Sequence, residues 1–136
     1  MTTTMIPKFT MMLGFVFCLM ACQNNSPNQN QTTSVVTQVL SVNEFAKGLE
    51  AGADVQLLDV RTPEEVSGGK IENAMNCNFY DSDFREKIKQ LDPEKATYVY
   101  CKKGGRSAKA AKLLEQAGFK EVYDLDGGYQ AWHAAR

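Results

Sequence analysis

The sequence carries almost no excess charge and only one histidine. Lysines and arginines number 15 and acidic residues 16, so the formal net charge of the 136-residue chain is −1. A chain so balanced has no basic field to attract nucleic acid, and we expect no such partner. The single histidine, His133, has no cluster of metal-ligand residues to join in the sequence, so we expect no metal site.

The N-terminal apolar run is too short to cross a bilayer. FTMMLGFVFCLMAC, residues 9–22, follows Lys8 and has 14 residues, whereas a membrane-spanning helix needs roughly 20. A short run after a lysine is typical of a signal peptide. Its last residues, LMAC at 19–22, resemble the lipobox of bacterial lipoproteins. That resemblance implies cleavage before Cys22 and a diacylglycerol on the Cys22 thiol; an uncleaved anchor or an ordinary secretory signal is the alternative.

A polar tract follows Cys22. Residues 23–34, QNNSPNQNQTTS, contain no charged and no aliphatic side chain. Such a tract buries too little apolar surface to offset its chain entropy, so we expect a disordered tether. The expected organisation is a signal peptide at 1–21, lipidated Cys22 with its tether at 22–34, and a folded domain at 35–136. The lipid would place the domain in the cell envelope, facing the periplasm, and Gln23 in place of aspartate favours the outer membrane.

Short β-branched runs alternate with amphipathic patterns from residue 35 onward. Ser41 with Glu44, and Thr62 with Glu65, have the spacing of capping boxes at helix starts. The alternation predicts an α/β domain with a mostly parallel sheet covered by helices on both faces. The expected strands are 34–40, 55–60, 73–79, 96–101 and 121–125, and the expected helices are 41–52, 62–66, 81–91, 107–116 and a C-terminal helix around Trp132.

Ligands of parallel sheets bind beyond the carboxyl ends of the strands, often facing a helix N-terminus. Two stretches fit that position, LLDVRT at 57–62 and YCKKGGRS at 100–107. In the second stretch, Gly104 and Gly105 allow positive φ, so successive N–H groups can turn inward as an anion-binding nest. The helix from Ser107 adds its positive dipole end, which lowers the pKa of a nearby cysteine by about one unit. Cys101 is therefore predicted to be a reactive thiolate that needs no neighbouring base.

Three motifs in order resemble those of the single-domain rhodanese family. They are LLDVRTPEE from Leu57, CKKGGRS from Cys101 and LDGGYQAW from Leu125. The resemblance extends over residues 35–136 and implies an α/β fold with a central five-stranded parallel sheet. It also implies transfer of sulfane sulfur through a persulfide on Cys101.

The resemblance implies a role for each matching residue. Cys101 is the nucleophile, Asp59 and Arg61 brace the site, and the closing motif with Gly127, Gly128 and Trp132 is structural. The persulfide-binding loop, formed largely by backbone amides, consists of Lys102, Lys103, Gly104, Gly105, Arg106 and Ser107.

The same resemblance implies the reaction partners. Two lysines beside the cysteine are typical of loops that accept thiosulfate, because their positive charge attracts a dianion. The acceptor would be cyanide or a thiol. We expect a monomer, and no metal or organic cofactor because the cysteine carries the bond chemistry alone.

Two other functions remain open from the sequence. Cysteine-dependent phosphatases have five residues between nucleophile and arginine, whereas only four separate Cys101 from Arg106. This shorter loop argues against a phosphatase or an arsenate reductase. A non-catalytic binding module of the same fold is the other alternative, and the presence of Cys101 argues against it. Cys77 is expected to pack as a small apolar side chain, with a resolving or disulfide role as its alternative.

Overall fold

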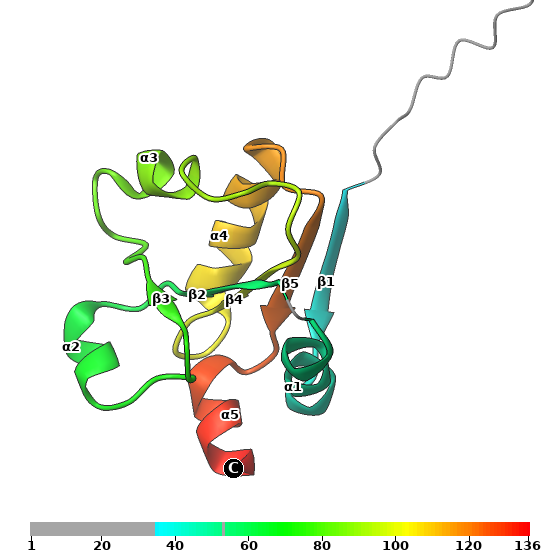
Figure 1. Ribbon diagram of the computed structural model, residues 1–136. Helices are drawn as coiled ribbons and strands as arrows, with labels where there is room; N and C mark the ends of the chain where they lie inside the picture. The colour runs from blue at the N-terminus through cyan, green and yellow to red at the C-terminus, as the bar shows by residue number, and fades with distance from the viewer. Residues whose placement is uncertain (1–34, 53) are drawn as a thin grey trace, which may run out of the picture. The chain divides into compact units, whose positions relative to one another are not determined.

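The computed structural model describes residues 35–52 and 54–136. The signal peptide, Cys22 and the tether therefore lie outside the described residues. Five strands form one fully parallel sheet in the order β1-β5-β4-β2-β3, as Figure 1 shows. The strands are β1 Val36–Leu40, β2 Gln56–Asp59, β3 Met75–Asn76, β4 Thr97–Tyr100 and β5 Glu121–Leu125, and the helices are α1 Val42–Ala51, α2 Pro63–Ser67, α3 Phe84–Ile88, α4 Gly105–Gln116 and α5 Gly128–Ala135.

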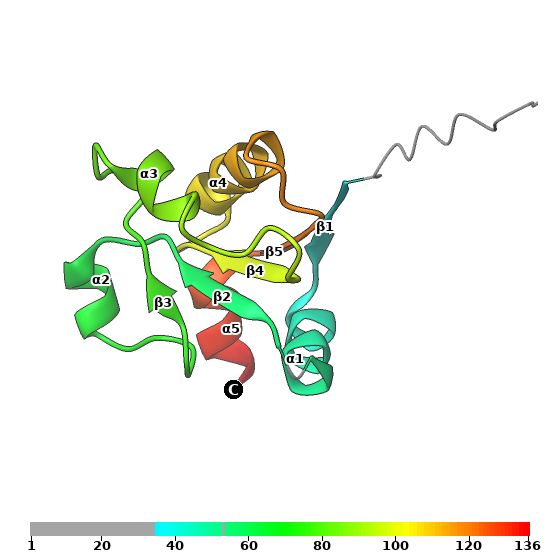
Figure 2. The same ribbon diagram turned by 45° about the horizontal axis from the view of Figure 1, so that its top comes forward.

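Helices cover both faces of the sheet, which confirms the predicted α/β class. In Figure 2, α3 and α4 lie on one side of the sheet and α1 and α5 on the other. On the α4 side, Val99 and Val122 pack with Leu114. On the α5 side, Tyr98 and Phe45 meet edge to face at 5.1 Å between ring centroids. Strand β4, buried along its whole length, therefore separates two apolar layers.

Both predicted capping boxes are confirmed. Ser41 accepts the amide hydrogen of Glu44 and begins α1, and Thr62 does the same with Glu65 to begin α2. Pro63 occupies the first turn of α2. Amides in the first turn have no partner within the helix, so the missing N–H of proline costs no hydrogen bond there. Within the described residues, no helix combines the length and apolarity needed to cross a membrane.

Three elements differ from their predicted extents. Strand β3 has only two residues, because this edge strand pairs with β2 only at Met75 and Asn76. Helix α3 spans 84–88 rather than 81–91, since the residues before it form a turn closed by the Phe84 amide and the Asp81 carbonyl. Helix α4 starts at Gly105, two residues earlier than predicted. The left-handed φ of +102° at Gly104 ends the loop at that point.

Candidate active site

Cys101 follows β4 at the carboxyl edge of the sheet, and its sulfur accepts hydrogen bonds from the loop that it begins. The Gly104 amide donates to Cys101 Sγ at 3.1 Å, and the Ser107 hydroxyl lies 3.5 Å from the same sulfur. Gly104 can direct its N–H inward because its φ is +102°, a backbone conformation that residues with a side chain rarely adopt. One amide of the predicted nest, that of Gly104, therefore points at the Cys101 sulfur just before α4 begins.

Two opposing effects set the pKa of the Cys101 thiol. Burial raises it, because the charged form loses solvation. The Ser107 hydroxyl and the backbone amides of Ser107, Lys103 and Gly104 together outweigh burial, so the pKa is lowered from its ordinary value. The structure thus favours a sulfur anion at this position.

Cys101 is only 2% exposed, yet it borders an open surface pocket. A small ligand in this pocket would meet Cys101 and the cationic groups around it. Lys102, Lys103 and Lys109 are exposed there, and none of the three forms an ion pair within the described chain. The pocket has a volume of about 380 Å³ and is lined by Tyr80, Cys101, Lys102, Lys103, Gly105, Arg106 and Lys109.

The guanidinium of Arg106 is held by α2 rather than by the sulfur. It donates two hydrogen bonds, at 2.7 and 2.8 Å, to the carboxylate of Glu65. The pair is mostly buried, with side-chain exposures of 16% for Arg106 and 24% for Glu65. Hydrogen bonding from Arg106 lowers the pKa of Glu65 to about 2, so Glu65 stays charged and neutralises Arg106.

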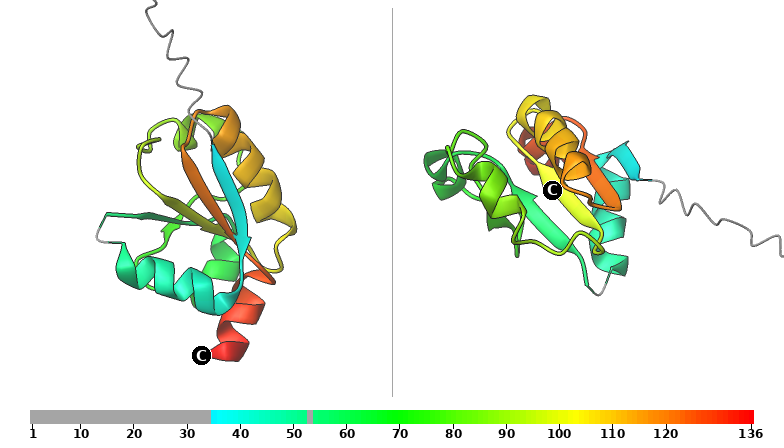
Figure 3. Two further views of the ribbon diagram at one scale, coloured as in Figure 1. Left: turned by 90° about the vertical axis from the view of Figure 1, so that its right-hand side faces the viewer. Right: turned by 90° about the horizontal axis from the view of Figure 1, so that it is seen from above.

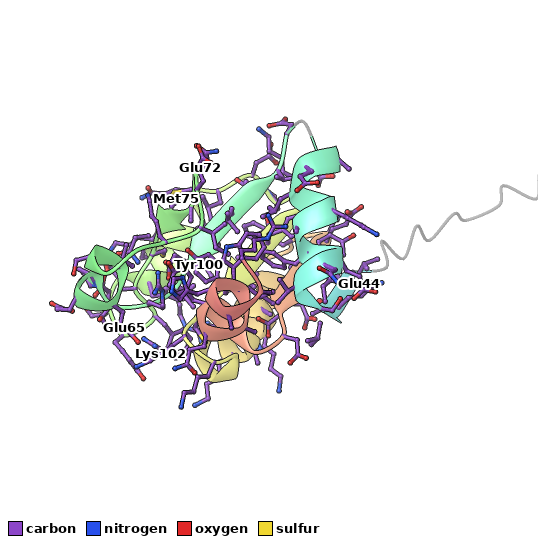
Figure 4. The ribbon with its side chains drawn as sticks, turned by 90° about the horizontal axis from the view of Figure 1, so that it is seen from below. Glu44, Glu65, Glu72, Met75, Tyr100 and Lys102 are labelled. Carbon is purple, nitrogen blue, oxygen red and sulfur yellow. The ribbon has the colours of Figure 1, made fainter. Side chains whose placement is uncertain are left out.

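Asp59 and Arg61 form a buried ion pair at the end of β2. The Tyr100 hydroxyl donates to Asp59 at 2.7 Å and accepts the amide hydrogen of Ile71 at 3.1 Å. Burial, together with the hydrogen bond to Asp59, raises the pKa of Tyr100. Figure 4 shows Tyr100 inside the domain and Glu65 and Lys102 toward its surface. The pair therefore supports the strand that carries Cys101, as a brace would, and neither side chain lines the pocket.

The start of α5 lies directly against the active-site loop. The Tyr129 amide donates to the Cys101 carbonyl at 2.7 Å, and the Gln130 amide donates to the Lys102 carbonyl at 3.1 Å. A Cβ on Gly128 would come within 2.5 Å of the Cys101 oxygen. The Arg61 guanidinium lies over the Tyr129 ring, 4.1 Å from its centroid. The closing motif predicted from the sequence is thus a structural support of the loop.

Cys77 is the other thiol of the described residues. It is 6% exposed in the apolar layer under α3 and α4, and it is a free cysteine, as Cys101 is. Burial raises the pKa of the Cys77 thiol, so it packs as a neutral group. The packing interpretation of Cys77 is confirmed.

Sequence reasoning missed two residues that border or shape this site. The capping box with Thr62 already explains a glutamate at position 65. Nothing in the sequence links Glu65 to Arg106, which lies 41 positions away. Tyr80 lies in a loop without periodicity, and its ring contacts Arg106 at 5.4 Å from the centroid. Its exposure is known only from the structure, so the sequence contains no signal for its place beside Arg106.

The domain is similar to known proteins in sequence and in fold. Residues 41–135 match the family model described as rhodanese-like domain. Thiosulfate sulfurtransferase GlpE of Shewanella oneidensis is 38% identical over 96 residues, 71% of this chain and 92% of that protein. A rhodanese-related protein of Thermoplasma volcanium is 34% identical with a TM-score of 0.63, over 72% of this chain and 92% of that one. A Rhodopseudomonas palustris protein described as a possible tyrosine phosphatase is 32% identical with a TM-score of 0.59, and the match covers 74% of this chain and 81% of that one.

Proposed function

The chain belongs to the rhodanese-like family, and we propose that it transfers sulfane sulfur from a donor such as thiosulfate to a thiophilic acceptor through a persulfide on Cys101. Relatives named as sulfurtransferases support the general reaction. The observation that carries the proposal is the Gly104 amide directed at the Cys101 sulfur. A donor in that position stabilises negative charge before and after the sulfur is received.

The first step loads the enzyme with sulfur. The Cys101 thiolate attacks the outer sulfur of thiosulfate, the sulfur–sulfur bond of the donor breaks, and sulfite leaves with the bonding electron pair. Cys101 then carries a persulfide whose terminal sulfur is negatively charged. The Gly104 amide and the Ser107 hydroxyl, which contact Cys101 Sγ, lie beside that terminal sulfur and, with the positive end of α4, would stabilise its charge.

The second step returns the thiolate. Cyanide or a thiolate attacks the terminal sulfur, forms the new bond to it, and leaves the electron pair on Cys101. The products are thiocyanate from cyanide or a persulfide from a thiol. Oxidation states balance across the two steps, so neither step needs an external oxidant or reductant.

The position of Arg106 separates this function from phosphatase chemistry. A cysteine phosphatase needs its arginine directed at the phosphoryl group, whereas the Arg106 guanidinium donates two hydrogen bonds to Glu65. Three lysines instead provide the charge of the pocket. Steady-state assays with thiosulfate plus cyanide, and in parallel with a phenyl phosphate, distinguish the two activities.

We expect thiosulfate-dependent thiocyanate formation that the Cys101→Ser substitution abolishes, with no phosphate release from the phenyl ester. Phosphate release that depends on Cys101 would reverse the assignment. If neither activity is present while the wild-type protein is folded, transfer from thiosulfate is excluded and the non-catalytic binding module becomes the favoured function.

For localisation we propose that a lipid on Cys22 anchors the domain to a membrane. The lipobox-like LMAC at residues 19–22 and the polar tract after it support this proposal. In a bacterial host that processes lipoproteins, the full chain should sediment with membranes, and Cys22→Ser should move it to the soluble fraction. Equal distribution of the two forms would exclude the lipid anchor.

A further inference from the structure

Tyr80 is an exposed aromatic residue on the rim of the active-site pocket. Its side chain is 69% exposed, and it lines the pocket together with Cys101 and three lysines. An aromatic ring in contact with water forfeits the free energy that burial would provide. Thiosulfate and cyanide are small anions without an apolar part that could pack on such a ring. Neither of them accounts for the position of Tyr80.

The turn that carries Tyr80 is held by hydrogen bonds and by packing. Asn78 Nδ2 donates to Asp81 Oδ1 at 2.7 Å, and the Tyr80 amide donates to Asn78 Oδ1 at 3.2 Å. Phe79 packs edge to face on Phe84, with 5.3 Å between ring centroids. The turn leads into α3, which lies beside α4, as Figure 3 shows. The Tyr80 ring is thus presented outside the core from an anchored segment.

The lining of the pocket has two chemically different parts. Lys102 and Lys103 of the loop bring two exposed charges. In the other part, the Arg106 guanidinium, whose charge is already paired with α2, lies over the Tyr80 ring at 5.4 Å from its centroid. Lys109 follows Arg106 by three positions on α4, so the two side chains share one face of the helix. This second part therefore combines an aromatic ring with one exposed ammonium group.

The pocket is larger than an inorganic anion requires. Its volume is about 380 Å³, within the range of roughly 300–1,000 Å³ that is typical of clefts for organic ligands. An anion of the size of thiosulfate or cyanide would leave much of this space to water. The space beside Tyr80 and Lys109 can therefore hold the carbon framework of an organic acceptor.

We propose that Tyr80 is a specificity-determining residue for the second step of the reaction, and that the acceptor is an organic thiol that carries a carboxylate. The ring packs against the carbon framework, and Lys109 pairs with the carboxylate. The acceptor thiol loses its proton to solvent, and its sulfur forms a bond to the terminal sulfur of the persulfide. The electron pair of the broken bond stays on Cys101. This inference rests on the proposed function, because it names the acceptor of that reaction.

The first test compares two acceptors, with thiosulfate as the donor and sulfite release as the readout. The probes are reduced glutathione, a peptide thiol that carries carboxylates, and cyanide. The measured quantity is the kcat/KM for glutathione divided by the kcat/KM for cyanide. We expect Tyr80→Ala to lower this ratio by at least about fivefold. Tyr80→Phe should restore it to within about twofold of wild type, because the ring rather than the hydroxyl makes the contact.

Met75→Ala is the matched control, since Met75 is 47% exposed and does not line this pocket. It should leave the ratio at the wild-type value. The proposal is overturned if Tyr80→Ala also leaves the ratio unchanged, or if Met75→Ala lowers it equally.

The role of Lys109 is tested with glutathione diethyl ester, in which the carboxylates are masked. Wild type should use free glutathione at least about threefold better than the ester, and Lys109→Gln should lose most of that preference. Lys112→Gln should keep it, because Lys112 is exposed on the same helix but does not line the pocket. Equal use of the ester and the free acid by wild type would overturn the assignment of a carboxylate-bearing acceptor.

A binding measurement separates this inference from the proposed function. S-methylglutathione, which has no free thiol, is titrated into the Cys101→Ser protein, and the backbone amide signals are followed by NMR. We expect shifts at Gly105 and Lys109, and a Kd that Tyr80→Ala raises by at least about fivefold in the same background. Absence of these shifts, or a Kd that does not depend on Tyr80, rejects the acceptor site even if sulfur transfer occurs. Binding that depends on Tyr80, in a protein whose wild type transfers no sulfur, refutes the proposed function and leaves the site in place.

Discussion

The carboxylate of Glu65 and the guanidinium of Arg106 form a bidentate ion pair across 41 positions of the chain. The pair fastens α2, which follows β2, to the loop that follows β4. Glu65 also accepts the Thr62 amide hydrogen at 3.0 Å, so one side chain caps a helix and anchors the active-site loop. The same contact neutralises the charge of Arg106, which lines the pocket, so the cations there without an ion pair among the described residues are Lys102, Lys103 and Lys109.

Glu65→Gln should destabilise the protein by about 1–3 kcal/mol at neutral pH, because Arg106 loses its charged partner while mostly buried. The measurement is the free energy of unfolding in urea. The folded-state pKa of Glu65 is about 2, below its ordinary value of 4.5. The stabilisation is therefore complete above pH 4.5 and is lost as the pH falls toward 2. The free energies of unfolding of the wild type and the variant should therefore become equal as the pH falls from 4.5 toward 2.

Glu64→Gln is the control for this prediction, because Glu64 is exposed beside Glu65 on the same helix. Its free energy of unfolding should stay within about 0.5 kcal/mol of wild type. A pH-independent difference for Glu65→Gln would mean that the ion pair contributes nothing to stability.

Gly128→Ala should disrupt the active-site loop. The new Cβ would approach the Cys101 carbonyl oxygen to 2.5 Å and the Lys103 amide to 2.8 Å, and φ at Gly128 is +59°. The backbone must shift, so we expect at least a tenfold loss of thiosulfate turnover and destabilisation by more than about 2 kcal/mol. Activity and unfolding of the purified variant are the measurements.

Gly68→Ala serves as the comparison, because its added Cβ would meet only the Glu65 carbonyl at an ordinary 3.7 Å. This variant should retain wild-type turnover. A fully active Gly128→Ala variant would show that thiosulfate turnover does not depend on the contact between α5 and the loop.

Tyr100→Phe should destabilise the domain by about 1–3 kcal/mol, because Asp59 loses a donor and the Ile71 amide loses its acceptor in a buried setting. Thermal and urea unfolding provide the measurement. Tyr98→Phe is the matched change on the same strand, and no hydrogen bond of the described residues involves the Tyr98 hydroxyl. Equal unfolding free energies for the two variants would mean that the hydrogen bond from Tyr100 to Asp59 does not stabilise the domain.

Lys102→Gln and Lys103→Gln should each raise the KM for thiosulfate by about threefold to tenfold, since one exposed charge near a dianion contributes about 1 kcal/mol. Added salt should reduce the difference from wild type by screening. Lys112→Gln is the control, because Lys112 is exposed on α4 and does not line the pocket. An unchanged KM in both loop variants would mean that the donor is recognised without these charges.

The parts of the site that depend on local chain geometry could be predicted from the sequence. A strand ending at Cys101, two glycines and a helix start specify where the amides point, and the Gly104 contact agrees. The capping boxes follow from short-range spacing in the same way. Such features require no knowledge of distant residues.

Contacts between distant segments could not be predicted. The pairing of Glu65 with Arg106 depends on the placement of α2 beside the loop, and that placement arises only when β2 and β4 become neighbours. Asp124 looked like an ordinary strand residue until the sheet register placed it under α4. The short extent of β3 likewise reflects its edge position, which its apolar sequence does not reveal.

Persulfide formation on Cys101 can be detected by intact-mass spectrometry of residues 35–136 after incubation with thiosulfate in the absence of reductant. We expect the wild-type protein to gain the mass of one sulfur atom and cyanide to remove that sulfur as thiocyanate. Peptide mapping should place the sulfur on Cys101. Cys77→Ser should behave as wild type, and Cys101→Ser should gain nothing. If the folded wild-type protein gains no sulfur, or if the adduct persists in Cys101→Ser, then Cys101 does not carry the transferred sulfur.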